Sequence, residues 1–379
     1  MTAPTDLAAG ANPAPNPAPN PAPNPPADPA RPPAAHHPFD RLTPQAILDA
    51  LDAVGQRGDG RLLQLNSYEN RVFQVMLEDG GAVVAKFYRP GRWTDAQIAE
   101  EHRFAADLAA AEVPVVAPLV LPDGQTLAHA LIDGQPFRVA VYPRRSGHGP
   151  ELDEPETLRW LGRFIARLHA VGQQQAFAHR RTLDAATFGH AALDRLLALG
   201  SVPPAQLPAW RSTCQQALAA VDAALAAAPS AALRLHGDCH PGNILWRDEG
   251  LDGGSGEGRG GIGPQIVDLD DAVMGPAIQD LWMLLSGSMD AMRGQMAAVL
   301  QGYRQFRRFD LRELALIEPL RTLRMIHHSA WLAERWGDPA FPPAFPWFGG
   351  AGYWGQQTVQ LQEQIEAMAA PPLDLAWLD

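Results

Sequence analysis

The spacing of apolar residues divides the chain into an N-terminal part built mainly of strands and a C-terminal part built mainly of helices. Before residue 142, apolar and polar positions alternate in short runs, which is typical of half-buried strands. One helix should follow the cap Thr43-Pro44, and a second should cover residues 94–111. The predicted strands cover residues 61–66, 71–77, 82–88, about 115–121 and 125–141.

From residue 154 onward the apolar spacing is mainly helical. Apolar residues recur every three or four positions from Leu158 to Leu168, and Gly172 should end that helix. Two strands around 244–246 and 265–268 interrupt the helices, and the Gly-rich residues 249–264 between them predict an expanded hairpin loop. Further helices should cover about 185–200, 205–228 and the residues up to about 335. The segment beyond 337 is rich in Pro and aromatic residues and should end in irregular structure.

This pattern predicts an α+β fold with two lobes. A small mixed lobe with an antiparallel sheet should occupy residues 39–141, and a larger, mainly helical lobe should occupy residues 142–379. Residues 1–38 are rich in Pro and Ala, repeat Asn-Pro-Ala-Pro, and lack the apolar side chains that a core needs. We therefore expect this segment to be a disordered tail, serving as a spacer rather than as a docking arm.

Composition and charge exclude several classes of protein. The 379 residues are enough for two domains, and the net charge of −12 argues against sequence-independent binding of nucleic acid. Neither an apolar run long enough to span a membrane nor a secretory signal is evident. The only cysteines, Cys214 and Cys239, make a disulfide framework improbable on composition. We expect a cytoplasmic protein without membrane or nucleic-acid partners.

The strongest chemical signal lies at residues 236–243, which read His-Gly-Asp-Cys-His-Pro-Gly-Asn. Asp238 and Asn243 have the spacing of a kinase catalytic loop, in which the Asp accepts the proton of the acceptor hydroxyl and the Asn binds Mg²⁺. Asp268 ends a strand about 25 positions later, where a kinase has its metal-binding Asp. Asp238 and Asp268 are the candidate catalytic residues, and Asn243 and Asp268 the candidate Mg²⁺ ligands.

Lys86 ends the run Val-Val-Ala-Lys and is the only lysine among the 30 basic residues. A compact ammonium suits the phosphates of ATP, which makes Lys86 the candidate nucleotide-binding lysine. A carboxylate of the following helix should brace it; Glu100 and Glu101 are the candidates, and we prefer Glu101. Ser67 and Asn70, in the segment that takes the place of a phosphate-binding loop, are the remaining candidates for nucleotide contacts.

Other interpretations of these residues carry less weight. His236, Asp238 and His240 could form a zinc site, but no further His or Cys follows within eighty residues. His236 is better explained as a structural residue of the loop, which Asp280 could hold by its backbone. Cys239 is expected to be a buried structural cysteine rather than a redox sensor.

Three features depart from an ordinary protein kinase. Residues 66–73 contain no glycine, Gly237 stands where those kinases have Arg, and Leu269-Asp270 follows the metal Asp instead of Phe-Gly. The motif His-Gly-Asp-x-His-x-x-Asn with a downstream Asp resembles the branch of aminoglycoside and choline phosphotransferases. More narrowly, the chain is similar to the stress response kinase A family of Gram-negative bacteria. The stretches that carry this likeness are residues 236–247, 267–272, 275–285, 317–321, 338–341 and 345–347.

The resemblance implies a protein-kinase-like fold and an ATP- and Mg²⁺-dependent Ser/Thr protein kinase. It further implies a cytoplasmic, monomeric enzyme that acts in stress survival and can phosphorylate itself. The residues alone lead only to a phosphotransferase that acts on a hydroxyl, and leave the acceptor open. A small-molecule kinase of the choline, aminoglycoside or homoserine type is the first alternative, since tryptophans and acids in the C-terminal part could line a cleft for a cation. A nucleotide-binding pseudokinase scaffold is the second.

Overall fold

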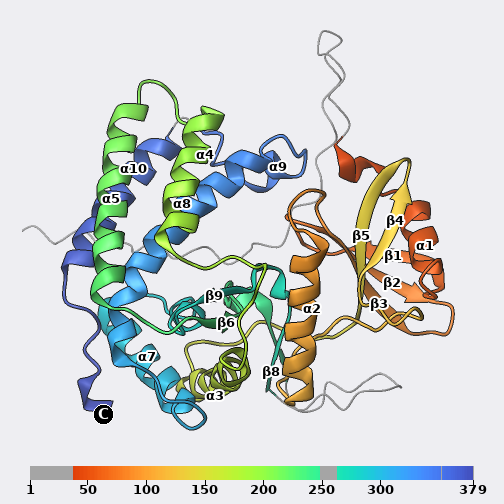
Figure 1. Ribbon diagram of the computed structural model, residues 1–379, viewed down its shortest axis with the longest axis horizontal. Coiled ribbons are helices and arrows are strands. Elements are labelled where there is room, and N and C mark those ends of the chain that lie inside the picture. The colour runs from red at the N-terminus through yellow and green to blue at the C-terminus, as the bar shows by residue number, and fades with distance from the viewer. Residues whose placement is uncertain (1–36, 248–262, 351, 379) are drawn as a thin grey trace, which may run out of the picture.

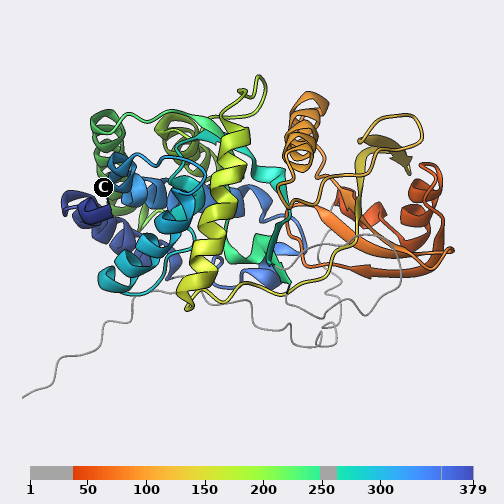
Figure 2. The same ribbon diagram turned by 90° about the horizontal axis from the view of Figure 1, so that it is seen from below.

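The computed structural model describes residues 37–247, 263–350 and 352–378 and has two lobes side by side along its longest axis (Figures 1 and 2). The smaller lobe contains a five-stranded sheet, and the larger lobe is mainly helical. The predicted α+β architecture is therefore confirmed. The predicted tail at 1–38 and the predicted loop at 249–264 fall almost entirely outside the described residues. Among the described helices, none combines the length and apolar character needed to cross a bilayer.

The small lobe is an antiparallel sheet with the strand order β1-β2-β3-β5-β4. Its central strand β3 (Ala82–Phe87) places alternate side chains on opposite faces, because successive residues of a strand point to opposite sides. Val83, Ala85 and Phe87 join the core under helix α1 (Pro44–Asp52), whereas Val84 and Lys86 face the other lobe. The remaining strands are β1 (Gly58–Gln64), β2 (Arg71–Leu77), β4 (Ala128–Ile132) and β5 (Gln135–Pro143).

Helix α2 (Asp95–Ala110) stands between the sheet and the helical lobe (Figure 1). Thr94 caps it: the Thr94 hydroxyl accepts from the N–H of Gln97, whose side chain accepts from the N–H of Thr94. Ile98 packs with Tyr88 and Trp93 in a small core of its own. The helix thereby presents Glu100 and Glu101 toward the junction of the lobes.

Two strand predictions in this lobe were wrong in detail. Residues 115–121 form no strand; only Val115 makes an isolated bridge, to Ile266. Prolines at 114, 118 and 122 explain this, since each lacks the N–H that a sheet ladder needs. The predicted strand 125–141 is a hairpin, because Asp133 (φ 47°) and Gly134 (φ 77°) form a turn between β4 and β5.

Helices α3 (Pro155–Gly172) and α7 (Met289–Tyr303) pack against each other in the large lobe, and the other helices of that lobe lie beside them (Figure 1). The two helices approach closely, because a Cβ on Gly162 would lie 2.0 Å from the carbonyl oxygen of Val299. The other helices are α4 (Ala191–Leu199), α5 (Leu207–Ala227), α6 (Gln279–Trp282), α8 (Ile317–Arg335), α9 (Phe341–Ala344) and α10 (Tyr353–Ala369).

Short strands and turns lie between these helices and hold the predicted site residues of the large lobe. Strands β7 (Ile244–Arg247) and β8 (Gly263–Ile266) pair antiparallel, as do β6 (Leu233–Leu235) and β9 (Val273–Gly275). The predicted helix at 185–200 begins as a π-helical turn, Ala185–His190, ahead of α4. The short 3-10 turns are Pro38–Arg41, Pro241–Asn243, Leu269–Asp271, Leu311–Leu316 and Ala376–Leu378.

The predicted helices stopped at about residue 335, but residues 353–369 form a further helix, α10. Trp354 and Leu361, seven positions apart, are buried against α5. The indole N–H of Trp210 donates to the buried Gln357 at 2.7 Å. The prolines that suggested irregular structure end at Pro346 in this region, so they stop before the helix starts.

Candidate active site

A cavity of about 1250 Å³ lies between the lobes and collects most of the predicted site residues. Lys86 and Glu101 line it from the small lobe, and Asp238, Asn243 and Asp268 line it from the large lobe. Apolar side chains that line it include Val72, Val84, Val116, Tyr142 and Leu245. The cavity thus has an apolar part of the kind that accepts a flat aromatic group, next to a charged part.

Lys86 is buried among three carboxylates. Its Nζ lies 3.0 Å from Asp268 Oδ1, 3.0 Å from Asp270 Oδ1 and 3.6 Å from Glu101 Oε1. Burial alone would lower the pKa of Lys86, but these carboxylates outweigh it and hold the pKa well above its ordinary value. The ammonium therefore keeps its charge inside the cavity, as a phosphate-binding group must.

The two neighbouring glutamates of α2 have different partners. Glu101, 2% exposed, lies between Lys86 and Arg180, whose Nη2 is 2.9 Å from Glu101 Oε2. Glu100 instead accepts the backbone N–H groups of Ala178, His179 and Arg180 at 2.6 to 2.9 Å. The structure thus brings Glu101 and not Glu100 to Lys86, in the arrangement preferred from the sequence.

Helix α6 holds the backbone of the loop that contains Asp238. Asp280, fully buried, accepts the backbone N–H groups of His236 and Gly237, both at 2.8 Å, and contacts His169 Nε2 at 3.0 Å. The imidazole of His236 lies 3.0 Å from the carbonyl oxygen of Val267. The structural roles predicted for His236 and Asp280 are both observed.

Gly237 is required by the backbone of this loop. Its φ of 84° lies in the left-handed region, which favours glycine, and a Cβ would lie 2.3 Å from the carbonyl oxygen of Asp271. An arginine at this position, as in ordinary protein kinases, would not fit without moving the segment that follows Asp268.

Asp238 lines the cavity, and the cation Arg324 lies beside it. Arg324 of α8 donates to Asp238 Oδ1 at 2.6 Å, and His240 Nε2 lies 3.5 Å from Oδ2. Burial would raise the pKa of Asp238, but Arg324 and His240 outweigh it and keep the pKa well below its usual value. Asn243 Nδ2 donates to the carbonyl oxygen of Asp238 at 2.9 Å, which leaves its amide oxygen for another ligand.

Asp268 has an unusual backbone conformation, with a φ of 59° in the left-handed region. A non-glycine residue there is uncommon, and such strain concentrates at functional sites. Asp268 Oδ1 contacts Lys86, and the side chain remains 48% exposed toward the cavity. Its second carboxylate oxygen is therefore accessible to a cation.

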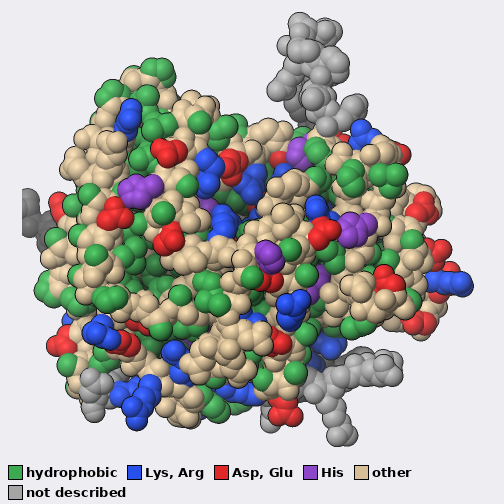
Figure 3. Space-filling view, in the orientation of Figure 1, with side chains coloured by type: hydrophobic (Ala, Val, Ile, Leu, Met, Phe, Trp, Pro, Cys, Tyr) green, Lys and Arg blue, Asp and Glu red, His purple; other side chains and the backbone are tan. Residues whose placement is uncertain are grey.

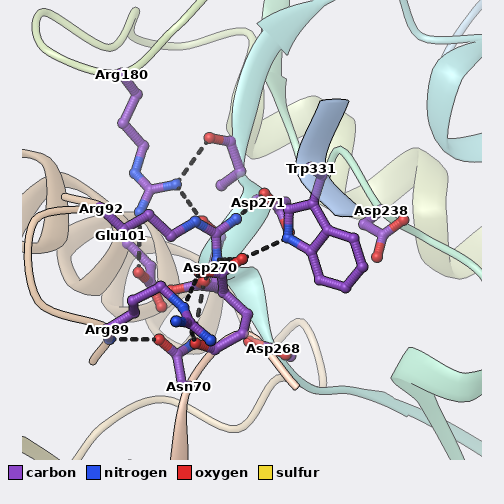
Figure 4. A network of polar contacts seen from close by, with 12 residues as sticks. Asn70, Arg89, Arg92, Glu101, Arg180, Asp238, Asp268, Asp270, Asp271 and Trp331 are labelled. Carbon is purple, nitrogen blue, oxygen red and sulfur yellow. Dashed lines mark hydrogen bonds and ion pairs between the residues drawn. The ribbon is translucent and has the colours of Figure 1, made fainter. Parts of the chain in front are cut away.

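Sequence reasoning missed the arginines that surround this acidic segment. Arg92, five positions after β3, donates to Asp270 and, at 2.5 Å, to Asp271 (Figure 4). Arg180 donates to the carbonyl oxygens of Asp270 and Ala272 at 2.8 and 2.9 Å. These arginines lie far from their partners in the sequence, and the chain contains many arginines, so no local motif distinguishes them.

The glycine-free segment before β2 is tied to the large lobe. Glu69 accepts from the indole N–H of Trp331 and from Arg335, and also pairs with Arg89. Asp338, 2% exposed, accepts from Arg71 at 2.9 Å and Arg89 at 2.7 Å. We call these contacts of Glu69 and Asp338 the lobe clamp.

The two predicted nucleotide contacts of this segment differ in position. Ser67 lines the cavity. Asn70 is 2% exposed, and its side chain accepts the N–H of Arg89 at 3.0 Å and donates to Asp270 at 3.2 Å (Figure 4). The Asn70 amide is thus occupied within the polar network and does not line the cavity.

The donors that face the cavity fit Mg²⁺ and a nucleotide better than zinc. The Asn243 amide oxygen and the Asp268 carboxylate are hard oxygen ligands, and Mg²⁺ commonly uses few protein ligands and retains several waters. Within the described parts of the chain, no group of three His, Cys, Asp or Glu side chains is arranged to hold a metal ion. Cys239 is fully buried, and burial raises the pKa of its thiol, as expected for a structural cysteine.

A family model described as a phosphotransferase enzyme family (APH) matches residues 61–317. Stress response kinase A of Escherichia coli strain K12 is 43% identical over 337 residues, which cover 89% of this chain and 97% of that protein. The serine/threonine protein kinase RdoA of Salmonella typhimurium strain LT2 is also 43% identical, over 338 residues with the same coverage.

Two solved structures share the fold at low sequence identity. A structure of amicoumacin kinase hAmiN in complex with AMP-PNP, Ca²⁺ and Ami has a TM-score of 0.67 and 18% identity, covering 90% of this chain and 98% of that one. The microcompartment-associated aminopropanol kinase has a TM-score of 0.62 and 17% identity, covering 85% and 96%. The predicted protein-kinase-like fold is thereby confirmed.

Proposed function

This chain belongs to the stress response kinase A family of phosphotransferases, and on that premise we propose that it is an ATP- and Mg²⁺-dependent Ser/Thr protein kinase. The observation that carries the proposal is the convergence of Lys86, Asp238, Asn243 and Asp268 on one cavity between the lobes. Bound Mg²⁺–ATP would supply the transferable γ-phosphoryl group. Lys86, braced by Glu101, would hold the nucleotide phosphates, and Ser67 would contact them from the small lobe.

Asp238 would orient the acceptor hydroxyl and accept its proton. The low pKa that Arg324 and His240 impose keeps the carboxylate ionised, so it is ready to accept a hydrogen bond from the hydroxyl. Asn243 and Asp268 would bind Mg²⁺ through the oxygens that the protein leaves accessible. Asp280 would act only through the loop, by fixing the backbone of His236 and Gly237.

The acceptor in this proposal is a protein hydroxyl, including one on the enzyme itself. The name of the Salmonella relative, a serine/threonine protein kinase, supports a protein acceptor. The names of the Escherichia coli relatives support a role in stress survival. A monomer that works in the cytoplasm completes the proposal.

Incubation of the full chain with ATP and Mg²⁺, followed by intact-mass measurement, tests it. We expect the wild type to gain phosphate and Asp238→Asn to gain none. Lys86→Met and Asp268→Ala should also abolish transfer while leaving the circular-dichroism spectrum unchanged. Wild-type rates in either of these two variants would overturn the site assignment.

The alternatives predict different results in the same experiment. A small-molecule kinase would turn over ATP slowly, without a gain of protein mass, until an acceptor is added. A pseudokinase would bind nucleotide and turn over none. The complete set of Lys86, Asp238, Asn243 and Asp268 argues against a pseudokinase, because a scaffold has no need of all four.

A further inference from the structure

One side of the cavity is formed by basic residues of the large lobe. We call it the basic wall; its charged members are Arg181, Arg195 on α4 and Arg324 on α8. His327 and His328 on α8 complete it as neutral side chains, because burial lowers the pKa of both imidazoles. Figure 3 shows basic side chains gathered near the centre of one face, between α4, α8 and α2. In a chain of net charge −12, such a gathering does not follow from composition.

The acids of the cavity are already paired with cations. Asp238 pairs with Arg324, Asp271 with Arg92, and Glu334 with Arg195. Glu69, Glu101 and Asp268 are engaged by arginines or by Lys86. Apart from Asp268, whose second oxygen is the proposed Mg²⁺ ligand, the acids described in the cavity are therefore neutralised and do not favour a cationic acceptor such as an aminoglycoside or choline.

Arg181 differs from the other two arginines of the basic wall, Arg195 and Arg324, which are paired with carboxylates. Its guanidinium lies over the rings of Trp93, at 4.9 Å, and Phe188, at 5.3 Å. Within the described residues it has no carboxylate at ion-pair distance. Burial lowers the pKa of Arg181, and the carboxylate of Asp271, which lies beyond ion-pair distance, offsets this effect only in part.

Ring contacts connect Arg181 to the proposed catalytic base. Phe188 lies between Arg181 and His327, with 4.5 Å between the centroids of Phe188 and His327. His327 is three residues after Arg324 and therefore on the same face of α8. Arg324 contacts Asp238. An acceptor whose hydroxyl reaches Asp238 would therefore pass along this wall.

We propose that the basic wall, through Arg181, binds an anionic side chain of the acceptor, so that the protein segment phosphorylated is an acidic one. A carboxylate or a phosphate close to the reacting hydroxyl provides the counter-ion that Arg181 lacks, and a guanidinium binds both in a bidentate manner. This inference rests on the proposed function, because it takes the acceptor, and with it the anionic side chain, to be part of a protein.

The test compares peptides that differ only in the residues flanking a single serine: Glu, phosphoserine, Gln or Lys. With full-length enzyme, kcat/KM should be highest for an anionic flank and lowest for Lys, and the Glu and phosphoserine peptides tell carboxylate from phosphate. In Arg181→Gln the ratio between Glu and Lys peptides should fall about tenfold, the effect of one charged hydrogen bond, with KM for ATP unchanged. Arg181→Lys, which keeps the charge, should retain part of the preference.

Arg293→Gln is the matched control, since Arg293 lies on α7 outside the cavity and pairs with Asp290 on the surface. Binding of labelled peptides in which Ala replaces the serine gives a readout that does not depend on turnover. Equal binding of Glu and Lys peptides by the wild type, or an unchanged preference in Arg181→Gln, overturns the inference. A wild type that binds the Glu peptide but phosphorylates no peptide contradicts the protein-kinase proposal instead.

Discussion

His102 illustrates how a single buried residue is held neutral beside the active site. It lies on α2 next to Glu101 and is 3% exposed, with Nε2 2.9 Å from the Tyr88 hydroxyl and Nδ1 2.8 Å from the Thr126 hydroxyl. Burial, together with the charges of Lys86 and Arg180, lowers its pKa from 6.5 to about 3. The folded protein therefore excludes a proton that the unfolded chain would bind.

This predicts the pH dependence of stability. Above pH 6.5 His102 is neutral in both the folded and the unfolded state, so it does not affect the free energy of unfolding. As the pH falls from 6.5 toward 3, only the unfolded chain takes up the proton, so the free energy of unfolding decreases. At pH 5 the cost is about 2 kcal/mol. Between pH 7.5 and 5, the free energy of unfolding of His102→Gln, measured in urea, should therefore fall by about 2 kcal/mol less than that of the wild type. Equal losses in the two proteins would show that the pKa of His102 is not lowered in the folded state.

At the scale of residues, the sequence identified the groups that a local motif carries. The spacing of Asp238, Asn243 and Asp268 and the end of a strand at Lys86 were sufficient to predict that they line one cavity. Arg324 was missed because it lies 86 positions from its partner Asp238, with no motif of its own. Asn70 lay in the predicted segment, but only the three-dimensional network shows that its amide is occupied.

Helix α10 shows what an element contributes to the large lobe. Trp354, 3% exposed, packs edge-on against Trp210 of α5, with ring centroids 5.3 Å apart. The helix also covers part of α8, which carries Arg324 and the rest of the basic wall on that helix. A C-terminal element outside the cavity therefore supports one that lines it.

Trp354→Ala should destabilise the protein by about 3–5 kcal/mol, because it leaves a cavity in the core. Urea unfolding measures the change, and Trp377→Ala, at an indole that is 64% exposed, is the matched control. A loss for Trp354→Ala no larger than that for Trp377→Ala would show that α10 is not part of the cooperative core.

Element prediction succeeded where periodicity was regular and failed where turns decided the outcome. The helix at α3 and strands β2 and β3 were predicted nearly to their ends. The hairpin of β4 and β5 was missed because its turn uses positive φ at Asp133 as well as Gly134, which a single Asp-Gly pair only suggests. The helix α10 was missed because nearby prolines outweighed a sparse apolar pattern.

On the scale of the whole molecule, the lobe clamp fixes the small lobe to the C-terminal segment. Asp338 holds Arg71 of β2 and Arg89, which follows β3. Asp338→Ala would leave two partly buried guanidinium groups without their carboxylate, and breaking a buried pair commonly costs about 3–5 kcal/mol. We therefore expect a loss of this order in urea unfolding, and weaker nucleotide binding as the lobes separate.

Asp310→Ala is the matched control, since Asp310 pairs with Arg312 at the surface and should show a much smaller change. Asp338→Asn keeps the shape and one acceptor, so it separates loss of charge from loss of packing. If Asp338→Ala unfolds like the control and binds nucleotide as tightly as the wild type, the clamp does not hold the lobes together.

The isolation of Lys86 also determines how this protein reacts with amine-directed chemistry. No other side-chain amine exists in the chain, and this one is 5% exposed and held protonated by three carboxylates. Acylating reagents and lysine-modifying enzymes therefore meet a surface with no lysine to modify. Any adduct that peptide mapping locates on Lys86 marks the proposed nucleotide site itself and reports whether that site is open or shielded.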